Sequence, residues 1–125
     1  MLLVLNMFLQ LSHAKLQACS TSSKLVTECY RLTEKFPSTE KFALIRQIRR
    51  SAFSVHLNLA EGCSRKSQLE RKRFFKISRG SLIELDTAFD IAVKLNYCSN
   101  EYLSQLGIYL IDTFKMLSGI INNNH

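Results

Sequence analysis

The sequence predicts an all-α protein, an antiparallel up-and-down four-helix bundle in a single domain. Glycine and proline are scarce, with four glycines and one proline among 125 residues, so the chain lacks the frequent turn residues that β folds need. Apolar residues recur at alternating spacings of three and four in four successive segments, and no strand pattern competes. Because only a few residues separate these segments, consecutive helices are expected to be antiparallel neighbours.

The first two helices are predicted at about residues 14–36 and 40–62. Pro37 should stop the first, because proline lacks the backbone N–H and cannot continue a helix. Residues 38–40, Ser-Thr-Glu, should supply the N-cap and an early acidic residue for the second helix, and Gly62 should end it. The apolar stripes are Leu25, Cys29, Leu32 and Phe36 in the first helix, and Phe42, Ile45, Ile48, Ala52, Val55 and Leu59 in the second.

The third and fourth helices are predicted at about residues 68–95 and 100–121. Ser67 and Glu70 match a capping box, in which the serine hydroxyl accepts a hydrogen bond from the amide three residues further on. Both helices have more apolar residues than one core requires, and such a surplus commonly becomes a subunit interface, although a wide core stripe is the alternative. The residues concerned are Phe74, Phe75, Ile77, Ile83, Ile108, Tyr109, Ile111 and Phe114.

Residues 1–13 form an apolar segment that precedes the predicted domain of residues 14–122. A signal peptide is one interpretation, and the residues before Cys19 resemble a lipoprotein cleavage box. However, no Lys or Arg precedes the apolar run, which is far shorter than the ~20 residues that span a bilayer. We therefore expect a helical turn or an oligomer contact there, in a cytoplasmic protein that does not enter a membrane.

The cysteines do not indicate a metal site. Cys19, Cys29, Cys63 and Cys98 include no C-x-x-C pair, and no histidine lies at metal-ligand spacing. We expect small, partly buried thiols in a reducing compartment, and no metal. The four glycines are far apart, which excludes the glycine-rich loops of dinucleotide and P-loop sites, so no cofactor is expected either.

Positive charge is concentrated in about a quarter of the chain. The formal net charge is +7, and residues 46–79 contain ten basic and two acidic residues, whereas the rest of the chain contains seven and eight. Such a segment indicates contact with a polyanion, above all nucleic acid; a solvated surface, neutralised in part by acidic residues of 80–125, is the alternative. The candidate nucleic-acid-binding residues are Arg46, Arg49, Arg50, Arg65, Lys66, Arg71, Lys72, Arg73, Lys76 and Arg79.

A polar stripe follows one face of the second predicted helix. Its members, spaced by three or four residues, are Arg50, Ser54, Asn58, Glu61 and Arg65. If Glu61 is buried, it needs a hydrogen-bonding partner, and arginine is the natural one. A ligand-binding or catalytic carboxylate is one interpretation. We favour a structural polar network of Ser54, Asn58 and Glu61 that fixes helix register or subunit pairing.

No catalytic residue is predicted, because no serine or cysteine nucleophile lies at a recognisable spacing from a base. We therefore expect a protein that is not an enzyme. The alternative is a ribonuclease. Arg49 or Arg50 together with His56 resembles the Arg-x(4–6)-His signature of the HEPN ribonucleases, which are helical bundles that cleave RNA without a metal. So short a pattern arises readily by chance in a basic helix.

A longer resemblance covers roughly residues 25–121. Phe36-Pro37, the runs 47–52 and 54–62, and the run Gly-Ser-Leu-Ile-Glu-Leu at 80–85 together resemble the 23S rRNA intervening-sequence proteins, also called four-helix-bundle proteins. One departure is His56, where the family usually has proline, so this helix should be straighter. The residues that match the family's motif are Arg49, Arg50, Asn58, Glu61, Gly62, Gly80, Ser81 and Glu84.

The resemblance implies a short bacterial cytoplasmic bundle that assembles into a homopentameric ring. A related protein, the accessory protein of diversity-generating retroelements, is a basic pentameric barrel that binds nucleic acid and a reverse transcriptase. Gly80 and Ser81, which are unfavourable in mid-helix, suggest that a neighbouring helix approaches closely there, near Ala60.

The leading hypothesis is a non-enzymatic homo-oligomer whose basic face contacts nucleic-acid phosphates, with RNA favoured, without reading base sequence. A structural or adaptor protein is the alternative, in which the basic face meets the acidic 80–112 surface of the next subunit or docks a protein partner such as a reverse transcriptase. A HEPN-like ribonuclease is the third hypothesis.

Overall fold

The computed structural model describes the backbone of residues 13–123 and the side chains of residues 17–123. Four helices, α1 (His13–Thr33), α2 (Leu44–Ser64), α3 (Gln68–Lys94) and α4 (Ser104–Asn122), make up most of it, and there is no strand in this range. Single 3-10 turns, η1 (Ser38–Glu40) and η2 (Glu101–Leu103), precede α2 and α4. The predicted apolar segment 1–13 lies outside the described residues except for His13, which begins α1.

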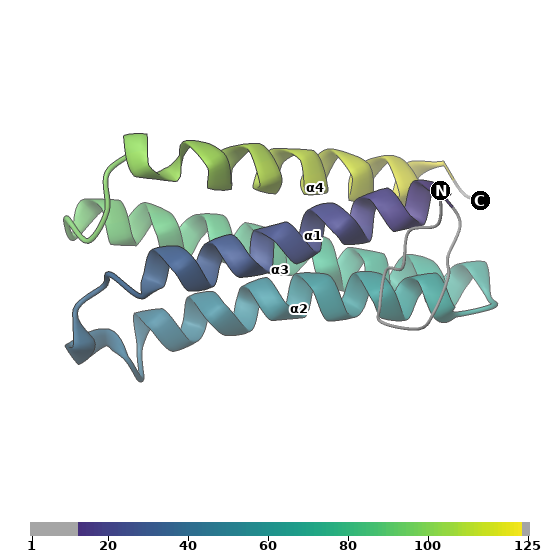
Figure 1. Cartoon of the computed structure of the whole chain (residues 1–125). Coiled ribbons are helices and arrows are strands. Elements are labelled where there is room, and N and C mark those ends of the chain that lie inside the picture. The colour runs from purple at the N-terminus through teal and green to yellow at the C-terminus, as the bar shows by residue number, and fades with distance from the viewer. Residues whose placement is uncertain (1–12, 124–125) are drawn as a thin grey trace.

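The helices form an up-and-down four-helix bundle. Successive helices run in opposite directions and lie side by side (Figure 1). α2 packs on α1 and α3, and α4 packs on α3 and α1, so that the four helices close around one core. The contact between α2 and α3 is the most extensive of the four. The all-α fold predicted from the sequence is therefore confirmed, whereas the ring assembly stays a prediction.

The first helix ends earlier than predicted, at Thr33 rather than residue 36. The pyrrolidine ring of Pro37 disfavours helical geometry in the residue before it, so the chain leaves the helix before it reaches the proline. Phe36 donates its amide proton to the Thr33 carbonyl at 3.1 Å in a tight turn. The Phe36 side chain nevertheless stays in the core, because the turn directs it back between the helices.

The second helix begins four residues later than predicted, at Leu44, because residues 38–40 form the 3-10 turn η1. The predicted N-cap was wrong, since no side chain caps α2 from the residue that precedes it. Glu40 substitutes for a cap in part, accepting a hydrogen bond from the Leu44 amide at 3.3 Å and another from the Tyr97 hydroxyl at 2.7 Å. Phe42, predicted to be a core residue of this helix, precedes it and is exposed.

The third helix agrees closely with its prediction at both ends. The Ser67 hydroxyl accepts from the Glu70 amide at 3.3 Å, as in the first half of a capping box. After Lys94, Asn96 adopts the left-handed conformation with φ 63°, and the Tyr97 amide donates to the Ala92 carbonyl at 2.9 Å. This pair of features is a Schellman motif, which satisfies the last carbonyls of the helix. The fourth helix starts at Ser104 rather than residue 100, because η2 occupies residues 101–103.

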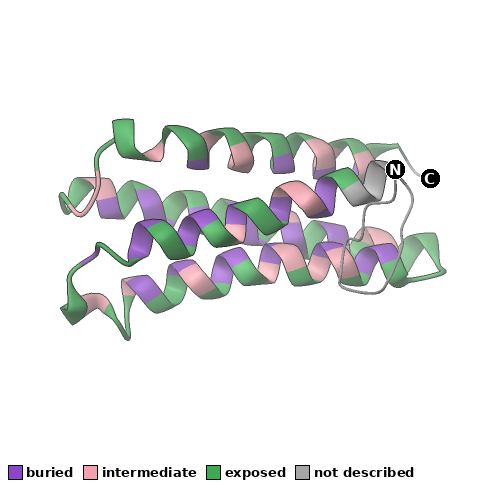
Figure 2. Ribbon diagram, in the orientation of Figure 1, coloured by how far each residue is buried: buried purple, intermediate pink, exposed green. Residues whose placement is uncertain are grey.

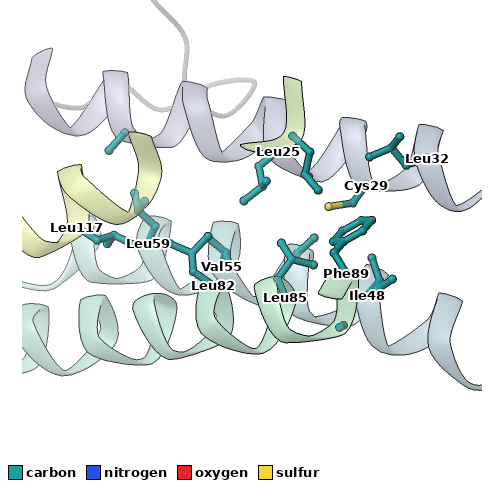
Figure 3. Packing of buried hydrophobic residues seen from close by; sticks show 14 of the residues in the cluster. Leu25, Cys29, Leu32, Ile48, Val55, Leu59, Leu82, Leu85, Phe89 and Leu117 are labelled. Atoms are coloured by element: carbon teal, nitrogen blue, oxygen red, sulfur yellow. The ribbon is translucent and has the colours of Figure 1, made fainter. Parts of the chain in front are cut away.

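The core is a continuous apolar layer between the four helices. Buried positions repeat along the inner side of each helix, and exposed positions lie outside (Figure 2). Cys19, Cys29 and Cys63 are buried in this layer and Cys98 is half-buried, and none of the four forms a disulfide. Figure 3 shows the central part of the layer, which includes Leu25, Leu32, Ile48, Val55, Leu59, Leu82, Leu85, Phe89 and Leu117.

The surplus apolar residues of the third and fourth helices fall into two groups. Phe75 is buried in the core and Tyr109 is half-buried against it; Phe74 is also half-buried, with the guanidinium of Arg65 over its ring. The other five are exposed in the single chain: Ile77, Ile83, Ile108, Ile111 and Phe114. The sequence pattern therefore reflects both a wide core stripe and an uncovered apolar surface.

Gly62 does not end α2, as the sequence suggested; it lies inside the last turn, which continues to Ser64. A β-carbon at this position would lie 2.6 Å from Cε1 of the Phe75 ring and 3.2 Å from the Arg71 carbonyl oxygen. The close approach expected at Gly80 is wrong, because a β-carbon there would meet nothing within 4 Å. The neighbouring Ser81 does contact α2, with its hydroxyl beside that of Ser54.

These two glycines give a matched pair of predictions. Gly62→Ala should lower the free energy of unfolding by about 1–3 kcal/mol, because the buried Phe75 ring must shift to admit the methyl group. Gly80→Ala should raise it by up to about 1 kcal/mol, because alanine is the better helix former and the space is open. Urea unfolding at equal protein concentration measures both changes, and effects of the same sign would contradict the assignment.

Candidate nucleic-acid interface

The ten candidate basic residues do not form one patch. Arg46, Arg49 and Arg50, here the α2-start cluster, lie at the beginning of α2. The turn cluster lies at the opposite end of the bundle, around the α2–α3 connection (Figure 1), and extends to the middle of α3. At 1.5 Å per residue, the fifteen residues from Arg50 to Arg65 place these two arginines about 22 Å apart along α2. The turn cluster consists of Arg65, Lys66, Arg71, Lys72, Arg73, Lys76 and Arg79.

Three arginines of the turn cluster take part in holding the bundle together. Nη1 of Arg71 donates to the carbonyl oxygens of Arg65 and Lys66, at 2.8 and 2.7 Å, and so fixes the connection between α2 and α3. Arg65 forms an ion pair with Glu61 at 2.7 Å. Arg79 donates to the hydroxyl of Ser118 on α4 at 3.3 Å. The positions of these side chains are therefore set by the protein.

Other cations of the turn cluster extend into solvent. Lys66, Arg73 and Lys76 are exposed and form no ion pair with any residue in the 17–123 range. Arg73 and Lys76 line a shallow hollow of about 570 Å³ on α3, together with the exposed apolar side chains Leu69 and Ile77. Unpaired ammonium and guanidinium groups on one surface attract phosphate groups and release the counterions bound to them.

In the α2-start cluster, Arg49 packs α2 against α1. Its Nε donates to the Thr33 hydroxyl at 2.9 Å, and its guanidinium lies 4.5 Å from the centroid of the Tyr30 ring. Both partners belong to α1. Arg46 and Arg50, by contrast, are exposed and form no ion pair within the described part of the chain.

The polar stripe of α2 is not one network, because Glu61 is separate from Ser54 and Asn58. The Ser54 hydroxyl lies 2.8 Å from the Ser81 hydroxyl of α3, and Nδ2 of Asn58 donates to the Ser54 carbonyl at 2.9 Å. Glu61 lies outside this group; it is exposed and bonded to Arg65. The arginine partner expected for Glu61 is present, but at the surface, where such a pair contributes only about 0–1 kcal/mol.

One member of the α2–α3 contact was not singled out from the sequence. The hydroxyl of Ser78, which is fully buried, donates to the Val55 carbonyl at 2.6 Å. The available signal was the spacing of two serines three residues apart, Ser78 and Ser81, within the apolar stripe of α3. Buried serines must be hydrogen-bonded, so this spacing points to a partner helix.

His56, the histidine of the ribonuclease-like pattern, is bonded to α1. Its Nδ1 lies 2.7 Å from the Ser22 hydroxyl, which itself donates to the Cys19 carbonyl at 3.0 Å. The tautomer in which Nδ1 of His56 has the proton lets both bonds form at once, with the serine hydroxyl accepting from the imidazole and donating to the carbonyl. Ser22 is 0% exposed, so this contact lies inside the bundle, away from any substrate. This geometry supports a structural role for His56 and Arg49, both of which fasten α1.

No group of three His, Cys, Asp or Glu side chains within residues 17–123 is arranged to hold a metal ion. Across the described helices, none combines the length and the apolar character needed to cross a membrane.

The fold and the exposed basic clusters together define a basic four-helix-bundle protein. Residues 14–119 match the family described as 23S rRNA-intervening sequence protein, and the chain belongs to that family. A similar solved structure is that of a protein with unknown function from the S23 ribosomal protein family of Bacteroides thetaiotaomicron. It shares 18% identity at a TM-score of 0.79, covering 86% of this chain and 97% of that chain, so it shares the fold. Among curated proteins, none matches this sequence.

The contact of His56 predicts a pH dependence of stability. Burial lowers the pKa of His56 below its ordinary value of 6.5, so the unfolded chain binds this proton more readily than the folded protein. As the pH falls through 6.5 towards the lower folded pKa, the free energy of unfolding should therefore fall; above 6.5 this group should have no effect.

The matched control is His56→Asn, which keeps a donor near the position of Nδ1 but does not titrate. Thermal unfolding of both proteins between pH 7.5 and 5.5 measures the difference. The parent should lose more stability over this interval than the variant, and parallel curves would show that His56 does not contribute.

Proposed function

We propose that this protein is a non-enzymatic homo-oligomer that binds nucleic acid, with RNA favoured, through phosphate contacts of its basic clusters. The observation that supports this proposal is the turn cluster, whose exposed Lys66, Arg73 and Lys76 have no carboxylate partner in the described range. Charges left unpaired within the protein are available to phosphates of a ligand. The family takes its name from sequences in 23S rRNA, which makes a structured RNA the first ligand to test.

The chemistry of the turn cluster favours contact with the sugar-phosphate backbone over readout of base edges. Its arginines Arg65 and Arg71 are fixed by bonds to the protein itself, and its exposed lysines are flexible point charges. Sequence-specific readout requires rigid donors that face base edges, whereas the rigid arginines of this surface already donate to the protein. Binding should therefore depend strongly on salt and weakly on base sequence.

The exposed apolar side chains of α4 support the second part of the proposal, self-association. Ile108 and Ile111 are each 53% exposed and lie one turn apart, and Phe114 follows on the same helix. Apolar residues this close together on a solvent-facing helix are typical of subunit interfaces. The same surface could instead receive a protein partner, which is the adaptor alternative, with the acidic Asp112 beside it.

The nucleic-acid proposal predicts a steep salt dependence. The logarithm of the affinity for a structured RNA should fall linearly with the logarithm of salt concentration. Replacing Lys66, Arg73 and Lys76 by Gln should reduce the magnitude of that slope by about 2–3, because each lost phosphate contact contributes roughly 0.7–0.9. Fluorescence anisotropy over a salt series measures the slope.

The control variant removes three lysines elsewhere: Lys24, Lys94 and Lys115 to Gln, which changes the net charge equally. These exposed residues lie outside the basic segment. The proposal would be rejected if the parent does not bind the RNA, or if its affinity does not change with salt concentration. Equal effects of the two triple variants would show that only the net charge matters.

Self-association predicts that the parent has a mass several times 14.4 kDa in solution, with five copies expected from the resemblance to the intervening-sequence proteins. Ile111→Asp should shift the protein towards the single chain, because burying an unpaired carboxylate in the interface is unfavourable. Ser23→Asp, at an exposed position of α1, introduces the same charge and should leave the mass unchanged. Sedimentation equilibrium at low and high salt tests this, and a monomeric parent would refute it.

A further inference from the structure

A groove lined by aromatic and cationic side chains lies beside the start of α2. The end of α1 and the beginning of α2 are adjacent (Figure 1), and the hollow between them has a volume of about 380 Å³. It is distinct from the turn cluster, which is at the other end of α2. The lining residues are Tyr30, Lys41, Phe42, Ile45, Arg46, Arg49, Arg50 and Phe53, here called the aromatic groove.

Three aromatic rings of the groove are open to solvent. Phe42 is 79% exposed, Phe53 48% and Tyr30 41%. Phe42 lies in the short connection between η1 and α2, where it adds little to the bundle core. Large apolar side chains that are gathered in a hollow and left uncovered indicate a binding surface.

The charge of the groove selects the kind of ligand. Its lining includes one lysine and three arginines but no aspartate or glutamate. Nζ of Lys41 lies 5.5 Å from the centroid of the Phe42 ring, and Arg49 lies above the ring of Tyr30, so cations and rings are interleaved. A suitable ligand therefore combines a flat, stackable group with a negative charge beside it. A nucleotide has both.

We infer that the aromatic groove binds an unpaired nucleotide of single-stranded nucleic acid. The base stacks on Phe42 and Phe53, while Lys41, Arg46 and Arg50 contact the neighbouring phosphates. Stacking on aromatic side chains next to a basic surface is the general mode of single-strand binding, and it is denied to the paired bases of a duplex. The inference rests on the proposed function and extends it: the turn cluster attracts any polyphosphate, whereas the groove prefers an unpaired segment.

Phe42→Ala tests the inference with little risk to folding, because this ring is mostly in solvent. The loss of one stacked base should weaken binding of an unstructured twelve-nucleotide single strand by about 5- to 150-fold. Binding of a blunt twelve-base-pair duplex should change less than twofold, and Phe42→Tyr should retain single-strand binding. Leu95→Ala, at a side chain that is 48% exposed just after α3 and outside both the groove lining and the turn cluster, is the matched control and should leave both affinities unchanged.

A second measurement reports on stacking itself. The chain has no tryptophan, so Phe42→Trp introduces a single tryptophan at the groove. A stacked base should quench its emission when the single strand is added, and the duplex should not. Unchanged emission at saturating single strand would overturn the inference.

The outcomes separate this inference from the proposed function. If neither oligonucleotide binds the parent, both fail. If both bind with a slope that the turn-cluster variant reduces, but Phe42→Ala has no selective effect, only the groove inference fails. It also fails if polyglutamate competes as well as the single strand, which would indicate an acidic peptide. A change of oligomeric mass in Phe42→Ala would instead indicate that a second copy occupies the groove.

Discussion

The close contact between α2 and α3 is the constraint on which the rest of the bundle depends. At one end Gly62 leaves room for the Phe75 ring, and further along Ser78 donates to the Val55 carbonyl and Ser54 meets Ser81. Small residues let the helices approach, and their hydroxyl groups then need partners on the facing helix, which leaves a single register. That register fixes where the connection at residues 65–67 lies, and with it the turn cluster.

The attachment of α1 uses side chains that look functional in the sequence. Arg49 bonds to Thr33 and stacks on Tyr30, and His56 bonds to Ser22, so both residues of the ribonuclease-like pattern join α1 to α2. The same helical spacing that would bring an arginine and a histidine together for catalysis also directs both towards a neighbouring helix. Polar residues along such a seam give the otherwise apolar contact its specificity.

The sequence predicted the number and type of helices, because apolar spacing is a local property that burial enforces. It did not predict the starts of α2 and α4. For α2 the reason is that Glu40 caps Leu44 while bonded to Tyr97, 57 residues away. Gly62 resembles a helix stop in the sequence because glycine is favoured both where a helix ends and where a neighbouring side chain approaches the backbone closely. For the candidate site, the sequence identified the ten basic residues but not their separation into two clusters. It also did not predict that Phe42 is exposed, because the spacing of Phe42 fits a core position equally well.

The bonds of Arg71 have a consequence for how the surface meets a ligand. Its guanidinium is held by two backbone carbonyls, so the charge is presented in a fixed place without any further loss of side-chain freedom on association. Flexible side chains such as Lys66 and Lys76 each lose roughly 0.5–1.5 kcal/mol of conformational entropy when a ligand immobilises them. The turn cluster therefore combines a preorganised charge at Arg71 with the adaptable charges of Lys66 and Lys76, whose side chains can adjust to ligands of different shape.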